Sequence, residues 1–225
     1  MIERRTFLTG IAVVGAASLI GCSSDDKPPI PPKTTTTATA TQAEPLDPTV
    51  VSTIASGLNV PWGIAFLASG DALVSQRDSG SIVRIGSGGE VTTLGVVAGA
   101  DAATSEGGLM GIALDPDDES VLYAYVSTKS DDRLVRLVVD GDRIGRPEPL
   151  ITGIRSATNH HGGRLLFDGS GHLFLAVGDG AQPATAQDRG TLNGSILRLD
   201  QEGRPASGNP CLFYTSDAAD EPLCF

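Results

Sequence analysis

Two histidines and an aspartate stand close together in a glycine-rich part of the sequence. Residues 159–165 read Asn-His-His-Gly-Gly-Arg-Leu, and Asp179 follows His160 by nineteen residues, between two glycines. An imidazole suits the work of a general base near neutral pH. A carboxylate on its other ring nitrogen would fix the tautomer and stabilise the imidazolium. His160 with Asp179 is therefore a candidate pair for taking a proton from a bound hydroxyl group, although the same residues are also common in exposed turns.

Glu106 is a further candidate, because it opens the run Glu-Gly-Gly-Leu-Met-Gly and its carboxylate could hydrogen-bond a bound molecule. His161 would point away from His160 in an extended segment, so we expect it to be structural or merely near the site. His172 follows a glycine at a hairpin turn and is expected to be exposed. The sequence shows no ligand set at zinc spacing and no phosphate loop, so no metal site is predicted.

Three segments of one plan must position these residues. Each opens with a glycine and apolar residues, and the openings lie 48 and 52 residues apart, at Gly63, Gly111 and Gly163. Each is followed by a turn signal and by a strand that is apolar on consecutive residues, at 72–76, 122–127 and 173–177. Such strands are expected to be covered on both faces. A third strand then carries a recurring arginine, which we expect at an edge that faces solvent or a neighbouring unit: Arg84, Arg136 and Arg198.

A repeat of about 50 residues with several short strands is typical of a β-propeller blade. We therefore predict an all-β fold in which residues 50–210 form a partial β-propeller of about three blades. A ring of six blades at this period would need roughly 300 residues. The third unit also carries an insertion, Gly180 to Leu192, of the kind that often builds a functional surface.

Residues 1–21 have the order of an export signal. Arg4-Arg5 followed by Phe7-Leu8 resembles a twin-arginine signal, and the apolar run 11–20 is too short to span a bilayer. Leu-Ile-Gly before Cys22 resembles a bacterial lipobox, in which the cysteine is acylated. We predict a lipoprotein on the outer face of the cell membrane, held there only by a lipid on Cys22. The alternative is an ordinary secretory leader with an incidental cysteine.

The segments that flank the propeller have unusual compositions. Residues 22–49 are rich in Thr and Pro and should form a disordered linker after the lipidated cysteine. Residues 211–225 closely resemble the translation of a sequencing adapter, so we expect a non-native tail and a gene that continues. The alternative for this tail is a disulfide between Cys211 and Cys224, which export would permit.

Composition agrees with a β-rich, exported protein. The chain has 28 glycines and 14 prolines among 225 residues, which favours short strands and tight turns over helices. Its net charge of -11 argues against a nucleic-acid partner, because phosphate binding needs clustered Lys and Arg.

Across residues 50–210, four motifs in order resemble the soluble pyrroloquinoline-quinone (PQQ) sugar dehydrogenases and the related aldose and sorbosone dehydrogenases. They are the glycine-rich run at 106–111, the His-x-x-Gly-Arg-Leu segment at 160–165, Gly-Asp at 178–179, and the segments at 192–200 and 208–210. Ser195 stands where the family usually has lysine, which weakens any inference about that position.

The resemblance implies a six-bladed propeller that oxidises the anomeric hydroxyl of an aldose or related sugar, with PQQ as hydride acceptor. His160 matches the family's catalytic base and Asp179 the acid that supports it. Glu106 matches a residue that contacts both substrate and cofactor, and Asn159 would contact substrate. The implied partners are a sugar and an external electron acceptor.

In this family, calcium ligands and the arginines that contact the cofactor lie in later blades, which have no counterpart in this sequence. The 225-residue chain is therefore expected to be a truncated form that neither closes a ring nor binds PQQ. The alternative function is that of a non-catalytic sugar- or protein-binding propeller lipoprotein, which needs no electron acceptor. A lactonase-type propeller hydrolase would need a metal cluster of Glu, Asn and Asp, and no such set is recognisable.

Overall fold

The computed structural model describes residues 48–102 and 105–209. The chain divides into two units, Met1–Pro48 and Thr49–Phe225, and every element described below belongs to the second unit. The predicted signal at 1–21, Cys22, nearly all of the predicted linker at 22–49, and the tail at 211–225 lie outside the described residues. Within the described part of the chain, no helix is long and apolar enough to cross a membrane.

Three antiparallel sheets contain all the strands of the described residues. The first is a four-stranded meander of β1 (Pro61–Phe66), β2 (Ala72–Gln76), β3 (Ser81–Ile85) and β4 (Val91–Val96). The second contains β5 (Leu109–Leu114), β6 (Val121–Ser127) and β7 (Asp132–Asp140), and β7 also pairs with β8 (Arg143–Ile144) and β9 (Glu148–Ile154). The third contains β10 (Gly162–Phe167), β11 (Leu173–Val177) and β12 (Ile196–Leu199). Between β11 and β12 lies a short 3-10 helix, η1 (Pro183–Gln187), inside the predicted insertion.

The nine strands expected from the repeat pattern are present, three to each sheet, which confirms the all-β blade-like organisation. The sequence analysis did not anticipate β4, β8 and β9. These outer strands are largely exposed, with only one buried residue in β4 and one in β9. They therefore lack the continuous apolar pattern that marks a buried strand.

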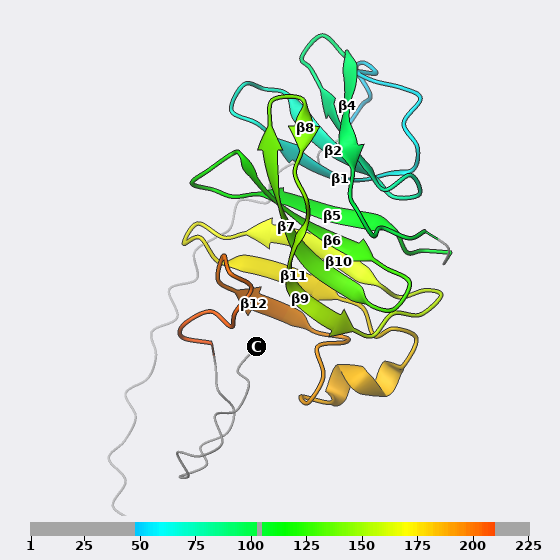
Figure 1. The fold of residues 1–225 in the computed structure, drawn as a ribbon, viewed down its shortest axis with the longest axis vertical. Helices are drawn as coiled ribbons and strands as arrows, with labels where there is room; N and C mark the ends of the chain where they lie inside the picture. The colour runs from blue at the N-terminus through cyan, green and yellow to red at the C-terminus, as the bar shows by residue number, and fades with distance from the viewer. Residues whose placement is uncertain (1–47, 103–104, 210–225) are drawn as a thin grey trace, which may run out of the picture. The chain divides into compact units, whose positions relative to one another are not determined.

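Two apolar clusters join the sheets into a stack (Figure 1). One packs Leu73 and Ile82 of the first sheet against Leu122 of the second. The other packs Leu134 of the second sheet against Leu175 of the third. The middle strands β2 and β6 are buried on both faces as predicted, whereas β11 alternates between buried and half-buried residues. No sheet of the described residues packs on the outer face of β11, which accounts for that difference.

The repeated glycines mark the places where the first strands of successive sheets approach one another. A Cβ atom on Gly63 would lie 3.0 Å from the backbone of Met110 and Ile112 on β5. A Cβ atom on Gly111 would overlap the carbonyl oxygen of Gly163 on β10. Strand β5 therefore lies close against β1 on one side and β10 on the other, and only glycine permits this spacing.

The recurring arginines lie at sheet edges, partly exposed, as predicted. Arg84 is 3.4 Å from Asp142, which lies in the turn between β7 and β8 of the neighbouring sheet. Arg136 pairs with Glu148 of β9 at 2.9 Å. The first pair links two sheets, and the second joins strands within one.

Candidate active site

His160 and Asp179 come together where two loops of the third sheet meet. His160 lies just before β10, and Asp179 lies two residues after β11, the strand that pairs with β10. The antiparallel register places Gly162 opposite Val177, so the two loops leave the sheet side by side. The Nδ1 atom of His160 is 2.9 Å from Oδ1 of Asp179. Their side chains are 53% and 20% exposed, respectively, so the imidazole is open to a molecule from solvent.

The contact with Asp179 decides what the imidazole can do. A carboxylate only accepts, so Nδ1 of His160 carries the proton and Nε2 is left able to receive one. Oδ1 of Asp179 also accepts the backbone N–H of Ala181 at 2.9 Å, and this second bond holds the carboxylate in place. The pair therefore has the arrangement of an oriented general base.

The backbone of His160 has a left-handed conformation, with φ of 63°, which is uncommon for a residue other than glycine. The carboxylate of Glu106 accepts its N–H at 2.8 Å, and its carbonyl accepts the N–H of Gly180 at 3.2 Å. The loop approaches the next turn so closely that a Cβ atom on Gly178 would overlap the His160 carbonyl. These contacts stabilise a conformation that costs of order 1 kcal/mol or more in isolation.

Glu106 and Asn159 lie beside His160. Glu106 is exposed, and the structure shows it bound to the His160 backbone across 54 residues of sequence. Ser105, next to it, donates from Oγ to the carbonyl of Thr158 at 2.8 Å, so the two loops are joined twice. Asn159 is half-buried, and its side-chain oxygen accepts from the Thr158 hydroxyl at 3.4 Å. Their predicted contacts with substrate or cofactor stay predictions.

Asn193 is a residue that the sequence analysis did not single out for this site. Its buried amide donates to the carbonyls of Arg155 and Gly178, both at 3.0 Å, and its oxygen accepts the Arg155 N–H at 3.2 Å. These bonds join the segment before His160 to the segment before Asp179. The only sequence signal was its place in a run that resembles the family, and no local pattern indicates such a bridging role.

The other two histidines have different surroundings. His161 is buried, and its Nδ1 atom is 2.9 Å from Oδ2 of Asp132. His172 was expected to be exposed, and this is wrong: it is partly buried, because Asp168 and Arg198 pack against its ring with nitrogen contacts of 3.3 and 3.0 Å. His172 lies at the end of the third sheet opposite to His160, since it immediately precedes β11, whereas Asp179 follows that strand.

Asp131, in the turn before β7, has an unusually acidic side chain. Burial by itself would raise its pKa. Hydrogen bonds from the Thr128 hydroxyl, the Gly153 amide, Arg133 and Ser130 outweigh that effect and lower the pKa to about 2. This carboxylate fixes the turn that precedes Asp132.

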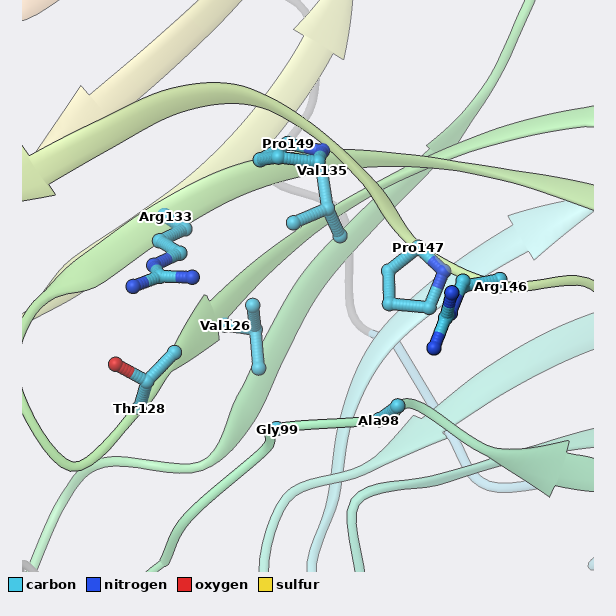
Figure 2. A pocket seen from close by; sticks show the side chains of 9 residues that line it. All are labelled: Ala98, Gly99, Val126, Thr128, Arg133, Val135, Arg146, Pro147 and Pro149. Carbon is cyan, nitrogen blue, oxygen red and sulfur yellow. The ribbon is translucent and has the colours of Figure 1, made fainter.

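A cavity of about 300 Å³ lies between the segment after β4 and the strands of the second sheet (Figure 2). Val126 and Val135 form its apolar wall, and Arg133 and Arg146 stand at its two sides. Arg133 is paired with Asp131 at 2.8 Å. None of the proposed site residues lines this cavity. Within residues 48–102 and 105–209, no group of three or more His, Cys, Asp or Glu is arranged to hold a metal ion.

Comparison with known proteins supports one family. The family model described as Glucose / Sorbosone dehydrogenase matches residues 58–221. The aldose sugar dehydrogenase YliI of Escherichia coli is 31% identical over 174 residues, which cover 71% of this chain and 46% of that protein. The quinoprotein glucose dehydrogenase B of Acinetobacter calcoaceticus is 25% identical, covering 90% of this chain and 48% of that protein.

The solved structures agree. The PQQ-bound aldose sugar dehydrogenase of Streptomyces coelicolor is 41% identical, with a TM-score of 0.70 over 73% of this chain and 51% of that one. A Thermus thermophilus protein titled a putative glucose dehydrogenase is 33% identical, with a TM-score of 0.67 over 76% and 53%. The chain thus spans about half the length of the relatives it matches. The family-model match and the shared fold show that this chain belongs to the glucose/sorbosone dehydrogenase family and forms part of a β-propeller.

Proposed function

We propose that this chain is the part of a PQQ-dependent sugar dehydrogenase that supplies the catalytic base. The observation that carries the proposal is the 2.9 Å contact between His160 Nδ1 and Asp179 Oδ1, on a half-exposed imidazole within a chain of this family. The relatives' names describe aldose and glucose dehydrogenases, and one of them was solved with PQQ bound. The proposed substrate is an aldose or related sugar.

In the proposed reaction, a sugar binds with its anomeric hydroxyl at Nε2 of His160. That nitrogen takes the hydroxyl proton, while PQQ supplies the electrophilic acceptor for the hydride. Asp179 keeps the proton on Nδ1 before the step and stabilises the imidazolium that the step creates. Glu106 holds the His160 backbone, and we propose that Glu106 and Asn159 also contact the bound sugar, with Glu106 reaching the cofactor as well.

The described residues fit one side of such a site. They provide a base with an acceptor nitrogen, a supporting carboxylate and exposed polar groups beside them. They do not form an acidic cluster for calcium. We therefore propose that calcium ligands and most groups that bind PQQ belong to other parts of the complete protein, as does the site for an external electron acceptor.

The outer faces of the first and third sheets favour a longer protein with further blades. Ile64 and Phe66 of β1 are 54% and 68% exposed, and Leu166 and Ile196 of the third sheet are 66% and 71% exposed. An apolar groove of about 690 Å³ runs along the first of these faces beside Trp62. Large exposed apolar areas normally mark surfaces that pack against something. We propose that later blades cover both faces and complete a six-bladed ring.

The test uses the complete gene product, reconstituted with PQQ and calcium and supplied with aldoses and a redox dye. We expect sugar-dependent dye reduction in the wild type and none in His160→Ala, with PQQ binding retained, because the base acts after the cofactor is bound. His172→Ala is the matched control, since it removes an imidazole that also pairs with an aspartate but lies outside the site. Turnover by His160→Ala would remove His160 from the mechanism. A wild type that binds sugar without reducing dye would favour the non-catalytic propeller.

We also propose that the protein is exported and anchored by a lipid on Cys22, which the twin-arginine and lipobox motifs favour. Radiolabelled palmitate should be incorporated into the wild type and not into Cys22→Ser. The variant should also be recovered in the soluble rather than the membrane fraction. Equal labelling of both proteins would contradict the anchor.

A further inference from the structure

The residue after the proposed base forms a second histidine–aspartate pair, which is buried. Nδ1 of His161 is 2.9 and 3.1 Å from the two carboxylate oxygens of Asp132, and both side chains are 1% exposed. Asp132 is the first residue of β7, in the sheet next to the one that His161 precedes. The pair therefore connects the loop that carries His160 to the neighbouring blade.

Asp132 is surrounded by donors. The Ser127 hydroxyl donates to its Oδ1 at 2.7 Å, and the Tyr125 hydroxyl donates to its Oδ2 at 3.3 Å. Burial, and next the charge of Asp132, raise the pKa of Tyr125, so this hydroxyl stays protonated and keeps donating. A buried carboxylate is tolerated only when such donors replace water. Loss of the His161 donor would therefore disturb the whole group.

The two adjacent imidazoles have opposite surroundings, because the left-handed backbone at His160 turns the chain between them. One side chain is 53% exposed and the other 1%. The carbonyl of His161 also accepts the N–H of Gly178, which lies next to Asp179. Anchoring His161 on Asp132 thus fixes the direction of the His160 side chain and its distance from the supporting carboxylate.

We propose that His161 is a positioning residue, whose bond to Asp132 holds the His160 backbone in its left-handed conformation and directs the His160 imidazole toward Asp179. This inference deepens the proposed function and rests on it for its catalytic meaning. An apolar ring at position 161 would fill the same space without the donor. Asparagine would keep a donor, since its Nδ2 atom occupies a position similar to that of Nδ1 in histidine.

The first test needs no activity and uses the 225-residue chain, which has only three histidines to assign. Long-range ¹H–¹⁵N NMR spectra distinguish the two imidazole tautomers. His160 should show the Nδ1–H tautomer in the wild type and in His161→Asn. It should show the averaged tautomers of a free imidazole in His161→Phe. His172→Phe is the control that should leave the His160 signals unchanged.

The result that would overturn the inference is a folded His161→Phe chain in which His160 keeps its wild-type tautomer and shifts. Where that variant does not fold, Ser127→Ala is the milder change, because it removes one donor to Asp132. It should move the His160 ¹⁵N shifts in the direction of free imidazole. Unchanged shifts in Ser127→Ala would overturn the inference equally.

The second test measures kinetics in the complete gene product. His161→Phe should lower kcat about tenfold or more with KM for sugar changed less than about twofold, because ground-state binding does not require the oriented base. His161→Asn should restore most of kcat. An inactive wild type would refute the proposed function and leave the NMR test to decide on the positioning role. An active His161→Phe protein with normal kcat would refute the positioning role alone.

Discussion

Replacing Asp179 by asparagine isolates the charge behind the proposed base. The amide oxygen of asparagine can still accept from His160 Nδ1 and from the Ala181 N–H, so the loop should keep its conformation. What the variant loses is the negative charge that stabilises the imidazolium during proton transfer. At the observed 2.9 Å, Coulomb's law gives about 1.4 kcal/mol in the dielectric of water and about 3 kcal/mol at half that dielectric.

Because 1.36 kcal/mol corresponds to a factor of ten in rate, Asp179→Asn should lower kcat by about 10- to 150-fold. The higher figure applies if a bound sugar excludes water from the half-exposed imidazole. KM for the sugar should change by less than about twofold, since the lost interaction strengthens only as charge develops. The assay is initial-rate dye reduction at saturating sugar by the complete protein with PQQ and calcium.

Asp168→Asn is the matched control for this prediction. Asp168 also pairs with a histidine, His172, at 3.3 Å, but outside the candidate site. Its variant should keep kcat within about twofold of wild type. If Asp179→Asn retained more than half of the wild-type kcat, or if both variants lost activity equally, the carboxylate would have no special role in the reaction.

Three further predictions concern the scaffold, each measured on the 225-residue chain. Gly111→Ala should lower stability by about 1–3 kcal/mol, since its Cβ atom would overlap the Gly163 carbonyl, while Gly169→Ala, with no neighbour within 4 Å, should have little effect in the same thermal unfolding experiment. Asn193→Ala should cost about 1–3 kcal/mol in urea unfolding, because the Arg155 and Gly178 carbonyls lose their donor, and wild-type stability in this variant would contradict the bridging role. The lowered pKa of Asp131 means that its contribution is present above about pH 4 and is lost as the pH falls toward 2. Asp131→Asn should therefore remove about 1 kcal/mol of that acid dependence after screening by solvent, and an unchanged slope of stability between pH 2 and 5 would contradict this.

The sequence predicted the inner and middle strands of each blade well, because these strands carry their burial in local pattern. Glycine-led openings, turn signals and consecutive apolar residues recur at nearly constant spacing, and each expected strand is present. The outer strands β4 and β9 were missed, since a largely exposed strand has no such pattern. Their pairing depends on neighbouring strands already being in place.

For the candidate site, the sequence supplied the residue types and the resemblance supplied their roles. The spacing of His160 and Asp179 indicated a pair, and strands β10 and β11 bring them together because their register is set within one hairpin. The expected exposure of His172 was wrong, because a turn sequence does not reveal that Arg198, 26 residues away, packs against the ring.

Residues that meet across blades were decided only by the tertiary structure. Glu106 reaches the His160 backbone across 54 residues, and His161 meets Asp132 across 29. Sequence patterns report what each segment prefers to bury, and so they determined the strands, the repeat and the candidate base. They contain no information on how far one sheet is rotated against the next, and that rotation places the carboxylates around the two imidazoles.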